Sequence, residues 1–257
     1  IQVGDFLAVH RNTDFWASNY VDTRPYMVGS VRNKFCPQPE MFGAKWGLLM
    51  GYLVGDGSWT ARSGMAVTVE HPETRQEVSD LFQDLFGKVS FQPDKRTKQT
   101  GSLRTHDKAM REFLHNLGFD WGSKADTKKT PWVILRSPRD VVKAYLQGLF
   151  ETDGSVTKNG KTVSFCTASE TLAKETQVLL LNFGVISRIR HKYVKKYNRT
   201  YYELILLGLR SRKTFAREIG FRSAKKSVPL HIGLLDVDRE GGDTESVPYQ
   251  REWFLRL

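Results

Sequence analysis

The chain contains one stretch of sequence twice, and this duplication limits its fold more than any other feature. Residues 51–58 read Gly-Tyr-Leu-Val-Gly-Asp-Gly-Ser, and residues 148–155, 97 positions later, read Gly-Leu-Phe-Glu-Thr-Asp-Gly-Ser. Self-similarity at a fixed offset is the signature of a structure built from copies of one unit. We therefore expect two similar halves related by a pseudo-twofold axis.

The segments that follow the two copies also correspond in order. A β-type run and then a helical pattern follow each copy, at residues 65–69 and 74–86 in the first half and 162–166 and 169–183 in the second. Each helical pattern stops at a glycine 31 residues past the aspartate of its copy, Gly87 or Gly184. Glycine suits a helix end because it adopts the left-handed conformation without a Cβ clash.

Beyond these glycines both halves become basic and strand-like, and each ends with a helical pattern and a lysine pair before a proline. The pairs are Lys128 with Lys129 and Lys225 with Lys226. Each half predicts helix, β-hairpin, helix, β-hairpin, helix, and the Asn-Gly at 159–160 is typical of a tight hairpin turn. Two unrelated α+β domains would not share so many features in one order. We expect an α+β fold of two αββαββα halves.

Small residues recur every four positions in both copies of the repeat. They are Gly47, Gly51 and Gly55 in the first copy and Ala144, Gly148 and Thr152 in the second. A spacing of four places such residues on one helix face. Each glycine inside a helix costs about 1 kcal/mol relative to alanine, a cost that is understandable if the stripe lets two backbones approach closely. We expect the two repeated helices to pack along these faces.

Asp56 and Asp153 then fall at the C-terminal ends of the two helices, with Gly57 and Gly154 as expected caps. A carboxylate there faces the negative end of the helix dipole, and two carboxylates brought together repel each other. A single Asp-Gly is most often a turn or a cap, but the duplication favours a function. Divalent cations such as Mg²⁺ would relieve both penalties, and carboxylates that share metal ions commonly serve phosphodiester hydrolysis.

The composition narrows the possible partners. The formal net charge of +11 favours a polyanion, because neutralising phosphates releases counterions, over a merely basic protein without such a partner. The basic residues do not lie on one amphipathic helix, and no apolar run is long enough to span a bilayer, so we expect no membrane partner. Two cysteines are too few for a disulfide framework or a zinc site. We expect an intracellular location, cytoplasmic or elsewhere, with access to DNA.

Residues 49–57 and 146–154 resemble the two motifs of LAGLIDADG homing endonucleases, and two copies about a hundred residues apart resemble the single-chain class. The similarity extends from about Lys45 to Pro229. It implies a monomeric enzyme that cuts both strands of a long, specific double-stranded DNA site and leaves short 3′ overhangs. It also implies two antiparallel sheets that form a DNA-binding saddle.

The resemblance further implies a shared metal site that uses the eighth residue of each motif, Asp56 and Asp153. We add the preceding residues, Gly55 and Thr152, to the expected metal site. Mg²⁺ is the expected ion, with Mn²⁺ or Ca²⁺ as alternative occupants. Basic residues near the metals assist catalysis in this family, and their positional candidates are Lys128 or Lys129 and Lys225 or Lys226.

Two basic hairpins, at residues 92–104 and 188–202, are the candidates for contact with DNA. A two-stranded ribbon can enter the major groove, where lysine and arginine mostly contact phosphates while arginine, glutamine and asparagine can read bases. The basic residues expected at this surface are Lys95, Arg96, Lys98, Arg104, Arg188, Arg190, Lys192, Lys195, Lys196 and Arg199.

The ends of the chain have no counterpart in the repeat. Residues 3–11 resemble a strand of intein splicing domains, but Ile1 is not a splicing nucleophile and no terminal His-Asn is present. We expect an endonuclease part of an intein, without self-splicing. The expected divisions are 1–44 (N-terminal segment, a possible splicing-domain remnant), 45–131 (first half), 132–232 (second half) and 233–257 (linker and tail).

Two other functions on the same fold stay open. A catalytically silent DNA-binding protein would bind duplex DNA without nicking it, although such relatives usually lose an acidic motif residue and both are kept here. An RNA maturase would prefer structured RNA to duplex DNA.

Overall fold

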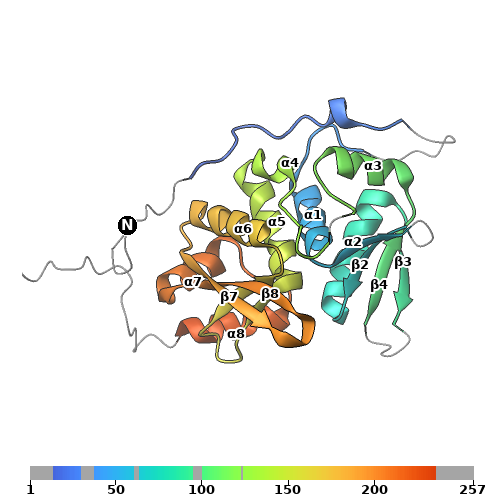
Figure 1. Ribbon diagram of the computed structural model, residues 1–257. Coiled ribbons are helices and arrows are strands. Elements are labelled where there is room, and N and C mark those ends of the chain that lie inside the picture. Colours follow the sequence, from blue (N-terminus) through green and yellow to red (C-terminus); the bar gives the residue numbers. More distant parts are fainter. Residues whose placement is uncertain (1–13, 30–37, 61–63, 95–99, 123, 236–257) are drawn as a thin grey trace, which may run out of the picture.

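The computed structural model describes residues 14–29, 38–60, 64–94, 100–122 and 124–235, which form two similar α+β halves (Figure 1). The expected αββαββα order is confirmed in both halves. The first half comprises α1 (Ala44–Asp56), β1 (Gly57–Thr60), β2 (Gly64–Val69), α2 (Pro72–Phe86), β3 (Ser90–Pro93), β4 (Gly101–Thr105) and α3 (Lys108–Asn116). The second comprises α5 (Arg139–Asp153), β5 (Gly154–Val156), β6 (Val163–Thr167), α6 (Glu170–Asn182), β7 (Ser187–Val194), β8 (Arg199–Leu206) and α7 (Gly208–Glu218). Further elements are the short helices η1 (Arg24–Tyr26), α4 (Trp132–Leu135) and η3 (Lys195–Tyr197), and α8 (Ala224–Leu235).

Each half contains one four-stranded antiparallel sheet, and the strand order is the same in both. The orders are β1-β2-β4-β3 and β5-β6-β8-β7. The duplication in the sequence therefore extends to the topology of the sheets. The second hairpins differ in length, since β7 and β8 have eight residues each whereas β3 and β4 have four and five.

The two halves meet through α1 and α5, which pack against each other in the middle of the molecule (Figure 1). In α1 every residue from Trp46 to Gly55 is buried. A helix that is covered on all sides needs apolar or small residues on all sides, as this one has. One hydrophobic core extends through both halves and includes the fully buried Tyr52, Phe82, Tyr145 and Phe150.

The glycines that follow the repeated helices have a different role from the one that a helix stop suggests. Gly87 does end α2 with a left-handed φ of 64°. Gly57 and Gly154 are also C-caps, but their φ values of −77° and −84° are open to any residue. A Cβ on Gly57 would lie 2.6 Å from the Cα of Leu53, so glycine is needed there for close approach. Each helix therefore passes into the first strand of its sheet without a loop.

The Asn-Gly sequence at 159–160 does form the turn between β5 and β6. Gly160 has a left-handed φ of 67°, whereas Asn159 does not have a positive φ. The Asn159 side chain instead accepts a hydrogen bond from the backbone N–H of Lys161 at 3.1 Å. The turn is therefore longer than the two-residue type in which both positions are left-handed.

The part of the N-terminal segment that the structure describes packs on both halves. Trp16 stacks on Phe183 of the second half, with ring centroids 4.6 Å apart. Tyr26 lies 5.0 Å from Trp132, and its carbonyl accepts a hydrogen bond from the Asn116 side chain at 3.1 Å. In Figure 1 this segment runs along one edge of the molecule, over both halves.

The two lysine pairs lie in unlike surroundings. Lys225 and Lys226 belong to the first turn of α8, which contains Pro229 and continues to Leu235, beyond the expected boundary at 232. Lys128 and Lys129 lie in an irregular segment before α4. Among the described residues, no helix is both long enough and apolar enough to cross a membrane.

Candidate functional site

The stripe of small residues lies in the contact between α1 and α5. A Cβ on Gly47 would lie 2.6 Å from the carbonyl oxygen of Val141, and a Cβ on Gly148 would lie 2.5 Å from that of Leu48. A Cβ on Gly51 would meet the backbone of α5, 2.8 Å from the nitrogen of Leu149. Ala144 is buried in α5. At the end of the stripe Gly55 faces the side chain of Thr152. The two helices therefore approach each other backbone to backbone.

This contact brings Asp56 and Asp153 into one electrostatic environment. The Asp56 side chain reaches solvent and Asp153 is half-buried, but the surrounding protein limits the hydration of both. Loss of hydration raises the pKa of Asp153 to about 7, and repulsion from Asp56 contributes to the rise. The pKa of Asp56 is also raised by loss of hydration, and the charge of Lys128 opposes the rise.

One lysine of each pair reaches the end of a repeated helix. The Lys128 ammonium donates to the carbonyl of Gly55 at 2.5 Å. The Lys226 ammonium donates to the carbonyls of Phe150 at 3.1 Å and Glu151 at 2.5 Å. Burial lowers the pKa of Lys226, and the charges of Glu151 and Asp153 oppose this change.

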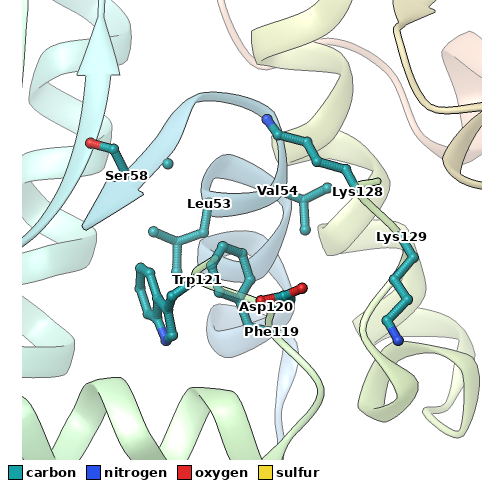
Figure 2. Close-up of a pocket in the computed structure, with 9 residues that line it drawn as sticks. Leu53, Val54, Ser58, Phe119, Asp120, Trp121, Lys128 and Lys129 are labelled. Atoms are coloured by element: carbon teal, nitrogen blue, oxygen red, sulfur yellow. The ribbon is translucent and has the colours of Figure 1, made fainter. Parts of the chain in front are cut away.

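The other two lysines point elsewhere. Figure 2 shows Lys129 directed away from Lys128, at the border of a small cavity of about 50 Å³ that Val54 and Trp121 also line. Lys225 turns toward His71, with 2.5 Å between Nζ and Nε2. Lys128 and Lys225 lie at the same spacing from their aspartates, but the geometry makes Lys128 and Lys226 the equivalent pair.

The oxygen atoms at this place fit a hard divalent cation. Two carboxylates with raised pKa values carry negative charge that the protein only partly neutralises. Among the described residues no group of three or more histidine, cysteine or acidic side chains could hold a metal. A site with so few protein ligands suits Mg²⁺, which retains water and binds substrate phosphates. A cavity of about 220 Å³ beside Asp56, bordered by Glu70 and Lys226, leaves room for such ligands.

Gly55 and Thr152 offer less to a metal than their positions in the sequence suggest. The carbonyl of Gly55 accepts the hydrogen bond from Lys128. The hydroxyl of Thr152 donates to the carbonyl of Leu149 at 2.9 Å. Neither residue presents a side-chain ligand, so the two carboxylates are the principal metal-binding groups here.

The basic residues of the second hairpin lie on the open face of its sheet. In β7 the side chain of Ile189 packs against the core, so Arg188, Arg190 and Lys192 alternate onto the opposite face. Arg190 pairs with Glu203 across the strands. Lys195 and Lys196 are exposed at the hairpin tip in η3.

The remaining basic candidates are less uniform. Arg104 shares β4 with the buried Leu103 and therefore lies on the open face of the first sheet. Arg199 lies 3.9 Å from Asp126, an acid in the segment between the halves. Lys95, Arg96 and Lys98 lie outside the described residues.

Several acidic residues that contact the lysine-bearing segments have no distinctive sequence pattern in a single half. Glu151, two residues before Asp153, is only 7% exposed and accepts backbone N–H bonds from Arg222 at 3.0 Å and Ser223 at 3.2 Å. Its counterpart in the first copy is Val54. A charged residue inside an apolar motif is the signal that points to Glu151, because buried carboxylates are rarely left without partners.

The raised pKa of Asp153 predicts how stability depends on pH. The folded state holds a proton up to about pH 7, whereas an unfolded aspartate releases it near 3.8. Stability is therefore greatest below about pH 4 as far as this group is concerned, and falls by a few kcal/mol as the pH rises to 7. A divalent cation competes with that proton, so Mg²⁺ should raise the melting temperature more at pH 8 than at pH 5. Calorimetry with and without Mg²⁺ measures this, and an equal rise at both values would contradict it.

Comparison with known families supports this geometry. Residues 140–220 match the model of the LAGLIDADG-like domain. A crystal structure of I-DmoI in complex with DNA and Mn is 19% identical, with a TM-score of 0.51, over 69% of this chain and 96% of that one. DUF199/WhiA from Thermatoga maritima is 14% identical, with a TM-score of 0.51, over 82% of this chain and 64% of that one. Both likenesses show the fold.

Curated relatives match over a part of their length. The replication factor C small subunit of Methanocaldococcus jannaschii is 30% identical over 77% of this chain and 11% of its own length. A DNA gyrase polypeptide of Mycobacterium gordonae is 36% identical over 82% of this chain and 39% of its own length. The chain thus spans well under half the length of these relatives.

Proposed function

Because this chain belongs to the LAGLIDADG family, we propose that it is a site-specific endonuclease that hydrolyses both strands of a long double-stranded DNA target with divalent metal ions, leaving short 3′ overhangs. One observation carries the proposal: the contact between α1 and α5 gathers Asp56, Asp153 and two lysines at one place. The structure of I-DmoI with DNA and Mn supports it as a fold relative. Since DUF199/WhiA shares the fold, the site and not the fold must decide the function.

Asp56 and Asp153 would hold the cation, Mg²⁺ in the first place and Mn²⁺ or Ca²⁺ as substitutes. When bound, the cation polarises the scissile phosphate and lowers the pKa of a water molecule. Lys128 and Lys226 place positive charge beside the acids, where it can balance the negative charge that grows on the phosphate. The close packing of α1 and α5 fixes these groups before DNA arrives, so little reorganisation is needed during the reaction.

The open faces of the two sheets are the proposed DNA-binding surface. Each repeated helix leads directly into an edge strand, β1 or β5, so each aspartate lies at the edge of its sheet. Two sheets on either side of one site can cover a long target and present one acid to it from each half. A second copy of the chain is then unnecessary, and we propose that the protein acts as a monomer.

The curated relatives suggest how the chain occurs in nature. Replication factor C and DNA gyrase have different functions, yet each contains a segment similar to this chain over a minor part of its length. A shared segment in unrelated proteins is typical of an inserted module, and we propose an intein as its origin. Within it we keep the division into 1–44, two halves and a tail, with the second half extended to the end of α8 at Leu235.

Cut-site selection on a randomised duplex library with Mg²⁺ tests the proposed function. The expected result is double-strand cleavage at one long consensus, with 3′ overhangs read from the sequenced ends. Enrichment by binding without nicking, under any divalent metal, would favour a silent DNA-binding protein. A preference for structured RNA over all duplexes would favour a maturase.

The geometry predicts which lysines matter for cleavage. Changing Lys128 or Lys226 to Met should lower the single-turnover rate constant about a hundredfold, because each removes charge beside the reacting phosphate. Changing Lys129 or Lys225 to Met should lower it only a few-fold, and these variants serve as matched controls. The rate is measured at saturating DNA. A larger loss in Lys225→Met than in Lys226→Met would overturn the assignment.

A further inference from the structure

A second pair of duplicated acids lies outside the two motifs. Glu77 is the sixth residue of α2, and Glu175 is the sixth residue of α6. These helices occupy the same place in the two halves. Both glutamates are half-buried, and each contacts the other half of the molecule instead of its own.

Glu175 holds the segment that carries Lys128. Its carboxylate accepts the backbone N–H of Thr130 at 2.7 Å. Ser169, the N-cap of α6, donates its hydroxyl to the carbonyl of Lys128 at 2.5 Å. Thr130 is 2% exposed and Ser169 fully buried, so water cannot easily replace these bonds. Lys128 is therefore fixed by α6 of the second half through its backbone and by α1 of the first half through its ammonium group.

Glu77 holds the segment that carries Lys226. Its carboxylate pairs with the guanidinium of Arg222 and accepts the hydroxyl of Tyr52 at 2.8 Å. One turn earlier in α2, Glu73 accepts the backbone N–H of Ala224 at 2.9 Å. Arg222 and Ala224 lead into the first turn of α8, where Lys226 lies. This lysine is thus fixed by α2 of the first half as well as by α5 of its own half.

We infer that Glu77 and Glu175 are positioning residues, each of which holds, across the pseudo-twofold axis, the segment that delivers the other half's lysine to the site. The inference rests on the proposed endonuclease function. A catalytic group that shifts by about 1 Å can cost a hundredfold in rate. Loss of either glutamate should therefore slow cleavage through one particular lysine, and that lysine belongs to the opposite half.

Hydrogen exchange tests the two contacts without any need for activity. In Glu175→Ala the amides of residues 128–130 should exchange at least about tenfold faster, while those of 222–224 stay unchanged, because a lost contact opens its own segment first. In Glu77→Ala the pattern should reverse. Faster exchange of both segments in both variants would mean general destabilisation and would overturn the inference.

Single-turnover cleavage at saturating DNA tests the link to the lysines. Glu175→Ala should slow the wild-type chain about tenfold or more, have almost no further effect in a Lys128→Met background, and keep its full effect in Lys226→Met. Glu77→Ala should show the opposite preference. Glu175→Gln, which keeps an acceptor for the Thr130 N–H, should recover most of the rate. The exposed acids Glu170 and Asp80, changed to Ala, are controls on the same two helices.

The two tests separate the possible failures. A wild-type chain that cuts no DNA would contradict the proposed endonuclease, and hydrogen exchange alone would then decide whether the cross-contacts exist. A wild-type chain that cuts, with Glu175→Ala equally fast or coupled to Lys226, would overturn this inference and leave the endonuclease intact.

Discussion

Changing Asp153 to Asn is expected to slow DNA cleavage by about a thousandfold or more and to leave the affinity for duplex DNA nearly unchanged. The substitution keeps the shape of the side chain but removes a charge that the proposed cation needs. DNA affinity depends mainly on basic residues of the sheets, such as Arg188 and Lys192, which the change does not touch. Asp56→Asn should behave in the same way.

Two measurements make this test specific to the metal site. Because the charge of Asp153 is held in a poorly hydrated place, Asp153→Asn should be at least as stable as the wild type in metal-free buffer at pH 8. It should also lose the rise in melting temperature that Mg²⁺ produces. Asp80→Asn, on the exposed face of α2, is the control. Rapid cleavage by both aspartate variants would refute the site assignment.

Changing Gly51 to Ala is expected to destabilise the fold by about 3 kcal/mol or more, because overpacking against backbone cannot relax. The added Cβ would meet the carbonyl of Tyr145 and lie 3.0 Å from the Cα of Gly148. In an exposed helix the same change would stabilise by about 1 kcal/mol, so the sign of the effect reports on the contact. Urea denaturation measures it. Gly29→Ala is the control, since nothing lies within 4 Å of its Cβ. A neutral Gly51→Ala would show that α1 and α5 do not touch there.

The fold could be predicted from the sequence largely because it is repeated. A feature that occurs twice at one spacing, such as the stripe from Gly47 to Gly55 and its counterpart from Ala144 to Thr152, carries its own control. Strand order followed as well, since both halves had to make the same sheet. The placement of Asp56 and Asp153 at helix ends follows from the same local pattern.

The details that the sequence did not reveal depend on orientation and on contacts across the halves. Equal spacing favoured Lys225 as the partner of Lys128, but the start of α8 at Ala224 turns Lys225 toward His71 and Lys226 toward α5. Distance along the chain does not report such a rotation. Glu175 and Thr130 are 45 positions apart, and nothing local to either residue marks the contact.

The direct passage of each repeated helix into a strand fixes one dimension of the molecule. Asp56 is followed at once by β1 and Asp153 by β5, so no spacer residue separates an acid from its sheet. The distance between the bases that a sheet reads and the phosphodiester bond next to its acid is then a constant of the backbone. Substitutions on the open faces can change which sequence is read, but no insertion point exists at which the cut could be moved along the target.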